Sequence, residues 1–364
     1  MALFLQILGI LFLIILFVVG IYVFIFVRAT RRVKKLSQLD SFYGGLHGFK
    51  APARIKLIRL SEPEWTNPEQ IEPIINEMMA QGFKSVGTYM VPNTHSSVQY
   101  QFLLHPIHGG TQASFVSQED GLTVILHEHP KFGIWSEAFW KYTSGKTLTV
   151  SNAQYGECFN VHPNHPKYFL KDASIFELID EIRKKRSVEP YEPVTPENFP
   201  ILIESLYAEE MDWRNLQGYL TDEELQRFVT SADIELDQSD LDIVRSLVID
   251  SASEGLSEAC QDSFIKTTSM PVAEWEAIRD HLVVIHDRMS GEDAASFLDS
   301  TPGLGEHLED DIEALEELES ATTSIRQAFA EINQKLPKNL QFKPLGQVEK
   351  PISADIYLTT EEIL

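Results

Sequence analysis

Cysteine is scarce in this chain of 364 residues, which contains only Cys158 and Cys260. The two cysteines lie far apart and form no C-x-x-C pair, so the sequence lacks the pattern of a small fold stapled by disulfide bonds. This low cysteine content favours a reducing compartment.

Complete catalytic and nucleotide-binding motifs are also missing. The chain contains neither G-x-S-x-G nor H-E-x-x-H, and the glycines at 44, 45 and 48 are not followed by the Lys-Ser/Thr of a phosphate loop. Asp233 and Asp237 do not begin an EF-hand, because Gln238 stands where that loop needs a glycine. These absences predict a non-catalytic protein, and they leave ligand or protein binding as the expected role.

Basic residues are outnumbered: 30 lysines and arginines stand against 54 acids, which gives a formal net charge of −24. Such a chain repels phosphate, so we expect no nucleic-acid partner. The acidity is not uniform, because residues 51–187 carry 13 basic and 14 acidic side chains whereas residues 188–336 carry eight and 35. The difference indicates two separate regions.

Charge is absent altogether from residues 2–27, an apolar run that only Gln6 interrupts. At about 1.5 Å per residue, a helix of this length exceeds the roughly 30 Å of a hydrocarbon core. A cleaved signal peptide would need a basic start and a small-x-small cleavage site, and neither is present. The run predicts one uncleaved transmembrane helix in contact with membrane lipid.

Five basic residues flank this run on its C-terminal side: Arg28, Arg31, Arg32, Lys34 and Lys35. Basic residues next to a span resist translocation, and no charged side chain precedes the run. We therefore expect a single-pass membrane protein with its N-terminus outside and its C-terminus in the cytoplasm.

Composition divides the chain into six segments. They are a transmembrane helix (1–27), a basic juxtamembrane tether (28–50), an α+β domain (51–187), a linker (188–200), an acidic helical domain (201–336) and a C-terminal tail (337–364). The linker is assigned from its prolines and glutamates.

Within residues 51–187 the hydrophobic period changes from that of a helix to that of strands, and then back. Asn67 as N-cap, Pro68 at the first helical position and Gly82 as the stop predict the first helix. Period-two segments predict strands at 83–91, 98–104, 111–117, 122–129, 134–142 and 147–152. Short turns between them imply an antiparallel β-meander. Ser174 with Glu177 forms a capping box for a closing helix.

The acidic region has helical signals throughout. Thr221 with Glu224 predicts one capped helix, and residues 241–249 suggest a second. Helical spacing predicts a third at Trp275, Ile278, Leu282, Ile285 and Met289. A fourth is expected over residues 306–335, either as a short coiled coil with a protein partner or a second copy, or as a helix packed in a bundle. The expected fold class is therefore α+β, followed by an acidic all-α region.

Histidine placement is the main hint of chemistry. Six histidines form three close pairs: His105 with His108, His127 with His129, and His162 with His165. Strand alternation would put the second pair on one face of the sheet, a geometry that suits two imidazole ligands of a divalent transition metal. One hypothesis is thus a metal site at His127, His129, His105 and His108, and surface or turn histidines are the alternative.

The segment from Gly121 to His129 spells G-x5-H-x-H. It resembles the opening of the first cupin motif, a metal-binding β-barrel signature. The pattern then breaks, because the acid that the motif needs is absent from Pro130 to Ile134 and no second cupin motif follows.

Two further groups have both a functional and an ordinary interpretation. Cys158, His162 and His165 form C-x3-H-x2-H, which suits zinc or a thiol with its base, although a fourth ligand is missing and loop packing is the expected role. An aromatic cluster could line a pocket for an apolar ligand or fill a sheet–helix core; its members are Trp135, Phe139, Trp140 and Tyr142.

The run that includes 87–89, 102–106 and 148–152, with the helix near Ser174, resembles uncharacterised bacterial membrane-anchored proteins. The resemblance covers residues 83–186, implies a bacterial inner membrane and transfers no active site. Three functions remain open. We expect a non-catalytic binding or scaffold protein; the alternatives are a metal-dependent enzyme built on His127 and His129, and a carrier of lipid or another small molecule.

Overall fold

The computed structural model describes residues 52–63, 65–92, 110–129, 133–154, 156–231, 236–300, 304–316, 318 and 324–359. The predicted transmembrane helix, the basic tether, the strand expected at 98–104, and His105 and His108 lie outside the described residues. Among the helices that are described, none combines the length and the apolar character needed to cross a membrane.

The fold is α+β, as expected, and is built on a seven-stranded sheet. Its strands are β1 (Ile58–Leu60), β2 (Phe83–Met90), β3 (Thr111–Ser117), β4 (Thr123–His129), β5 (Gly133–Lys141), β6 (Thr147–Ser151) and β7 (Lys167–Phe169). They lie side by side in chain order, and every pair is antiparallel except β6 with β7. The short turns of the sequence thus give the predicted meander.

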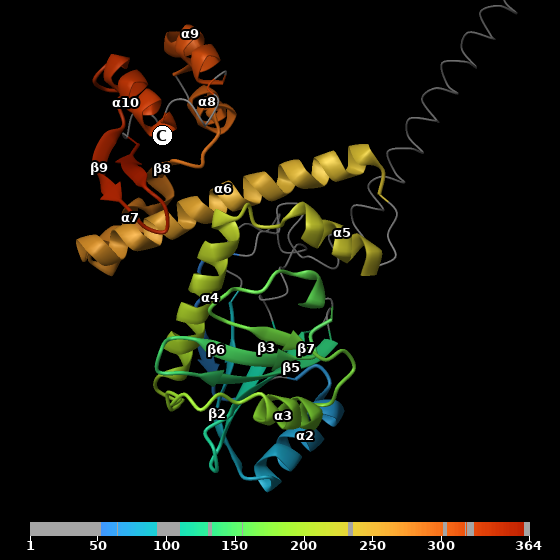
Figure 1. Ribbon diagram of the computed structural model, residues 1–364. Coiled ribbons are helices and arrows are strands. Elements are labelled where there is room, and N and C mark those ends of the chain that lie inside the picture. Colours follow the sequence, from blue (N-terminus) through green and yellow to red (C-terminus); the bar gives the residue numbers. More distant parts are fainter. Residues whose placement is uncertain are drawn as a thin grey trace, which may run out of the picture.

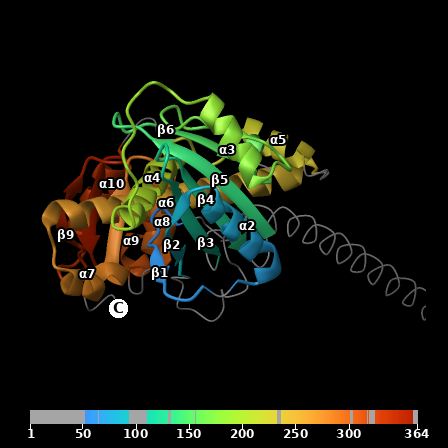
Figure 2. The ribbon, with the colours of Figure 1, turned by 90° about the horizontal axis from the view of Figure 1, so that it is seen from below.

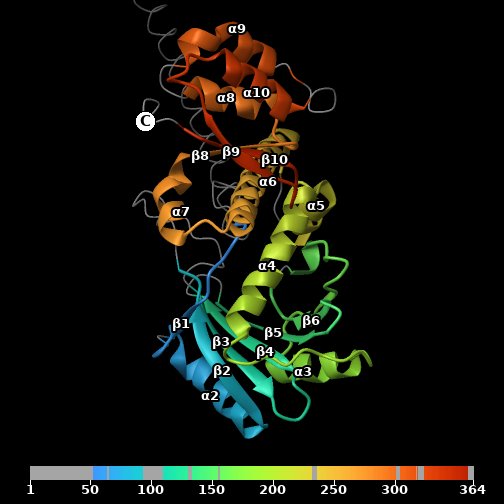
Figure 3. The same ribbon diagram turned by 90° about the vertical axis from the view of Figure 1, so that its left-hand side faces the viewer.

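Helices cover both faces of this sheet. On one face, α2 (Pro68–Ala80) and α3 (Ile175–Lys184) pack on a core that includes Phe115 and Trp140 (Figure 1). On the other face, α4 (Phe199–Leu216) crosses the strands and packs Phe199 against Tyr89 (Figure 3). Because α4 touches only part of its face, the rest is left for the site described below.

The predicted start and stop of α2 and the predicted start of α3 are correct, and α3 ends two residues before the predicted Arg186. The residues before α2 are held in an unexpected way. The side chain of Asn67 makes no capping bond; Oε2 of Glu128 on β4 instead accepts from Thr66 N at 2.8 Å, and its Oε1 accepts from Asn67 N at 2.7 Å. Gly82 ends α2 with φ of 86°. At α3, both bonds of the Ser174 capping box are made.

Residues 188–200, expected as a linker, pack on the sheet. Tyr191 forms an isolated β-bridge with Tyr142, and the backbone N–H of Glu192 donates to Lys141 O at 2.7 Å. Val194 is buried against the face that α4 covers. The segment therefore leads the chain directly from α3 to α4.

Beyond α4 lie α5 (Asp222–Ser231) and α6 (Gln238–Thr268). The Thr221–Glu224 capping box at α5 is confirmed. The helix expected at 241–249 extends to 31 residues, because its buried stripe continues through small residues such as Ala252 and Ala259. Gly255 lets α6 approach Asn215 of α4 closely, since a Cβ there would lie 2.4 Å from the Asn215 amide nitrogen.

The C-terminal part corrects two predictions. Its elements are α7 (Val272–Ile278), the 3-10 helix η3 (Arg279–His281), β8 (Leu282–His286), α8 (Gly291–Ser300), α9 (Gly305–Glu316), α10 (Ile325–Lys335), β9 (Lys343–Val348) and β10 (Ala354–Leu358). The acidic region is not all-α, and residues 337–364 are more than a tail, because β8, β10 and β9 form a three-stranded sheet in that order. These elements gather at α6, away from α2 and α3 (Figures 1 and 2).

The prediction of one helix over residues 275–289 is wrong after Ile278. Val283, Val284 and Ile285 are all buried, as in a strand covered on both faces, and β8 finds its partner β10 about 70 residues later in the chain. The single helix expected over 306–335 is two helices, α9 and α10. The apolar residues of α10 pack in the chain's own core, as the bundle alternative expects. Self-association or a protein partner at 306–335 stays a prediction.

Candidate functional site

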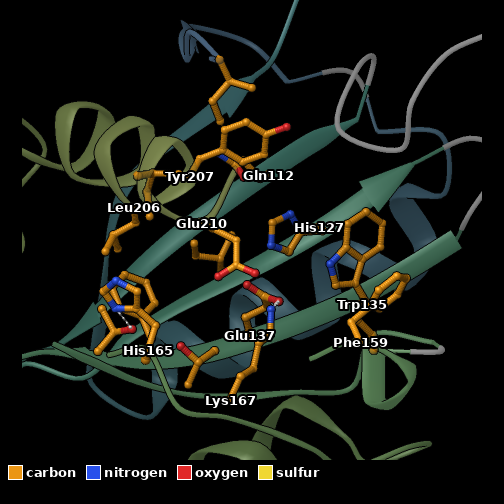
Figure 4. A pocket seen from close by; sticks show the side chains of 18 of the residues that line it. Gln112, His127, Trp135, Glu137, Phe159, His165, Lys167, Leu206, Tyr207 and Glu210 are labelled. Atoms are coloured by element: carbon orange, nitrogen blue, oxygen red, sulfur yellow. Dashed lines mark hydrogen bonds and ion pairs between the residues drawn. The ribbon is translucent and has the colours of Figure 1, made fainter. Parts of the chain in front are cut away.

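A cavity of about 500 Å³ lies between the sheet and α4. Strands β3 to β7 form its floor, α4 forms one wall, and the segment 153–165, which contains the 3-10 helix η2 (Gly156–Cys158), forms another (Figure 4). Ligand pockets for small molecules typically enclose about 300–1,000 Å³, so this cavity falls in that range.

Three polar or aromatic side chains cross the floor in a row. Gln112 is the cross-strand partner of His127, and His127 is the partner of Trp135, so strand register places the three on adjacent strands. The His127 and Trp135 rings are stacked, with centroids 4.7 Å apart and an interplanar angle of 3°. The stacking fixes the imidazole against the floor of the cavity.

An ion pair stands beside this row. Lys167 Nζ lies 2.5 Å from Glu137 Oε1, and the Ser151 hydroxyl donates to the same oxygen at 3.1 Å. Burial by itself would raise the pKa of Glu137, but the charge of Lys167, together with His127 and the two hydrogen bonds, lowers it overall. Glu137 is therefore a fixed carboxylate on the wall of the cavity.

His127 is neutral in this environment. Burial lowers its pKa to about 4, Glu137 opposes this shift, and Lys167 adds to it. An imidazole with so low a pKa is a weak base at neutral pH, so the site suits hydrogen bonding to a ligand better than general-base catalysis.

Two buried polar atoms on the floor have no hydrogen-bond partner among the residues that the structure describes. They are Nε2 of Gln112 and Nε2 of His127. Buried polar groups are nearly always paired, and an unpaired one costs about 1–3 kcal/mol. Because both side chains line the cavity, a bound molecule or water can supply the missing partners.

Apolar side chains form part of the cavity lining; they include Leu57, Ile125, Phe139, Ile203 and Leu206. Two ion pairs also line the cavity, Glu137–Lys167 and Glu210–Arg214. The cavity is thus amphipathic, and both of these cations are already paired with a carboxylate of the chain.

The aromatic cluster predicted from the sequence is divided between the two faces of the sheet. Trp135 and Phe139 line the cavity, whereas Trp140 and Tyr142 belong to the core under α2 and α3. Odd and even positions of one strand face opposite ways, so one half of the cluster fills a sheet–helix core and the other half lines the cavity. Ligand binding by the second half stays a prediction.

Only one member of the predicted histidine pair lines the cavity. His127 lines the cavity, while His129 is buried at the end of β4 beside Gly110. Cys158 is buried in an apolar cluster with side chains of α5 and α6. It is not among the residues that line the cavity, as His127, His162 and His165 are. Among the described residues, the only His/Cys/Asp/Glu group close enough to hold a metal ion is His162, His165 and Glu209.

Gln112, Glu137 and Lys167 were missed by the sequence reasoning. Glu137 and Lys167 are 30 residues apart and meet only because β5, β6 and β7 are neighbours in the sheet. Period-two alternation could have placed Glu137 on the face of Trp135 and Phe139, and it was the one available signal.

Searches of protein-family models, curated proteins and solved structures gave no match to this chain. The class that fold and site define is an α+β protein with an amphipathic cavity on one face of its sheet.

Proposed function

We propose that this chain binds an uncharged, largely apolar small molecule in the cavity between its sheet and α4. The observation that carries the proposal is a pair of buried atoms without a hydrogen-bond partner among the described residues, Nε2 of Gln112 and Nε2 of His127, on the floor of the amphipathic cavity. A ligand with one or two hydrogen-bonding groups would satisfy both atoms and bury its apolar body against Phe139 and Leu206.

The two ion pairs are the reason for proposing an uncharged ligand. Lys167 and Arg214 are both held by carboxylates, so an anionic ligand would have to compete with Glu137 and Glu210. A cationic ligand would have to displace Lys167 or Arg214. An alcohol, ketone, amide or ester group needs neither exchange.

A change that fills the cavity tests the proposal. We expect the uncharged fluorophore Nile red to bind the full chain with a blue-shifted emission, and Leu206→Trp to weaken binding at least about tenfold because the larger indole fills part of the cavity. The matched control is Ile201→Trp, on the same helix at a position that is 67% exposed. Equal affinity in both variants, or no binding by the full chain, would contradict the proposal.

The hydrogen-bonding end is tested separately. Native mass spectrometry of the purified chain should show a co-purifying molecule, and Gln112→Leu should reduce its occupancy because the amide donor is lost. Unchanged occupancy in this variant would remove Gln112 from the site.

We also propose that residues 1–27 anchor the chain in a membrane, with the bulk of the chain in the cytoplasm. The apolar run and the basic residues after it support this topology. A reporter fused after the last residue should be active in the cytoplasm. A reporter active only outside would reverse the orientation.

A further inference from the structure

Two histidines and a glutamate converge beside the cavity. His162 and His165 belong to the segment between β6 and β7, whereas Glu209 lies on α4. One potential ligand atom from each residue lies within 4.8 Å of the others. Both histidine side chains are largely buried and line the cavity, while the side chain of Glu209 is 47% exposed.

The contact between His165 and Glu209 has an unusual geometry. Nε2 of His165 lies 3.1 Å from Oε1 of Glu209, yet among the described residues this buried nitrogen makes no hydrogen bond. With the ring proton on Nδ1, which lies 3.0 Å from the Thr147 hydroxyl, Nε2 has no hydrogen to donate. A nitrogen lone pair and a carboxylate oxygen are then close neighbours.

Neighbouring ligands of one metal ion have this relation. With Zn–N and Zn–O distances of about 2.0–2.2 Å, adjacent ligand atoms of a tetrahedral site lie roughly 3.3 Å apart, and each points at the ion rather than at the other. The observed 3.1 Å is close to this edge length.

The far side of His165 is also arranged as in a metal site. Its Nδ1 lies 3.0 Å from the hydroxyl of Thr147 on β6. Histidines that bind metal almost always hydrogen-bond through their other ring nitrogen, which fixes the tautomer and the direction of the ligand atom. With Nδ1–H donating to Thr147, Nε2 carries the lone pair that a metal needs.

We propose that His162, His165 and Glu209 bind one divalent transition-metal ion of the zinc class. Two imidazoles and one carboxylate are a ligand set that zinc accepts, and three protein ligands leave a fourth position for water or a ligand molecule. Since both histidines line the cavity, the ion would stand beside it.

His162 is the weaker of the two histidine ligands. Its Nδ1 accepts a hydrogen bond from Asn164 N at 3.1 Å, which places the proton of a neutral ring on Nε2. Metal binding through either nitrogen must give up this arrangement and its hydrogen bond. We therefore expect His165 and Glu209 to contribute more to affinity than His162.

Zinc binding to the full chain tests the proposal. The chain, stripped of metal by a chelator, should bind one zinc ion in this cluster by calorimetry, and cobalt(II) at the same site should give the visible absorption of tetrahedral coordination. Glu209→Gln and His165→Ala should weaken zinc binding by more than about 100-fold, and Thr147→Val by about 10–100-fold through loss of the supporting hydrogen bond.

Two variants elsewhere serve as controls. His281→Ala, in η3, and Glu313→Gln, at an exposed position on α9, should leave zinc affinity unchanged. Circular dichroism of the metal-free variants verifies folding, and Glu209→Gln decides the matter if His165→Ala does not fold, because the glutamate is half exposed. A chain that takes up no zinc, or one whose zinc affinity is the same after Glu209→Gln, would overturn the proposal. Neither result depends on Nile red binding, so the metal site and the ligand cavity are tested apart.

Discussion

Replacing Lys167 by methionine should make the stability of the chain depend on pH through Glu137. The ammonium lies 2.5 Å from the carboxylate, and the two side chains are 31% and 22% exposed. Breaking a fully buried pair costs about 3–5 kcal/mol, whereas exposed pairs contribute about 0–1 kcal/mol. This intermediate pair should therefore cost about 1–3 kcal/mol at pH 7.

The sign of the pH dependence follows from the pKa of Glu137. In the native chain this pKa is lowered below its ordinary value of 4.5, so the carboxylate stabilises the fold above that pH and the contribution is lost as pH falls through the lowered pKa. Without Lys167, burial dominates and raises the pKa of Glu137. The deficit of Lys167→Met should thus be largest at pH 7 and should shrink near pH 4, where Glu137 takes up a proton.

Urea unfolding of the full chain, followed by tryptophan fluorescence at both pH values, measures this deficit. Lys184→Met is the matched control, because its partner Glu181 is on the same helix and the lysine is 72% exposed. Adding Glu137→Gln to Lys167→Met should recover part of the loss. A deficit that is equal at both pH values, or a double variant no more stable than Lys167→Met, would refute the reasoning.

Three further predictions concern stability. The pKa of His127 is about 4 in the folded chain and 6.5 ordinarily. The free energy of unfolding should therefore be full with respect to His127 above about pH 6.5 and fall by up to about 3 kcal/mol toward pH 4, because the unfolded chain takes up the proton first. His127→Gln should flatten the measured stability–pH curve over that window. Gly291→Ala should destabilise by about 1–3 kcal/mol in urea unfolding, since its Cβ would lie 2.1 Å from Leu315 O, and Ser296→Ala on the exposed side of α8 should have little effect. Ser174→Ala should cost about 1 kcal/mol in the same assay through loss of the capping box, and an unchanged midpoint would show that the cap is not needed.

Local signals predicted the first half of the described chain well. The helix stop, the capping box and the period-two strands depend on neighbours within a few residues, and the structure retains such signals at Gly82 and Ser174. The capping box at Thr221, in the second half, is retained for the same reason. The failures occur where a local pattern suits two structures. Residues 282–286 have helical spacing and are also a continuous apolar strand, and only the partner strand β10 decides between the two.

The candidate sites show the same limit. The sequence singled out Trp135, Phe139 and His127 as residues worth attention, and strand alternation was enough to say which of them share a face. The sequence pattern also indicated His162 and His165 as a pair, with Cys158 as the third member of the candidate site. The structure puts Glu209 there instead, because α4 crosses the sheet 44 residues further along the chain.

The sequence by itself therefore determined the α+β class, the meander and most helix ends, because these follow from side-chain periodicity and from hydrogen bonds between near neighbours. Tertiary structure decided the three-stranded C-terminal sheet, the split of the aromatic cluster, the Glu137–Lys167 pair and the convergence of His165 with Glu209. Each of these depends on which distant segments pack together, and that choice is set by the burial of whole faces rather than by any local signal.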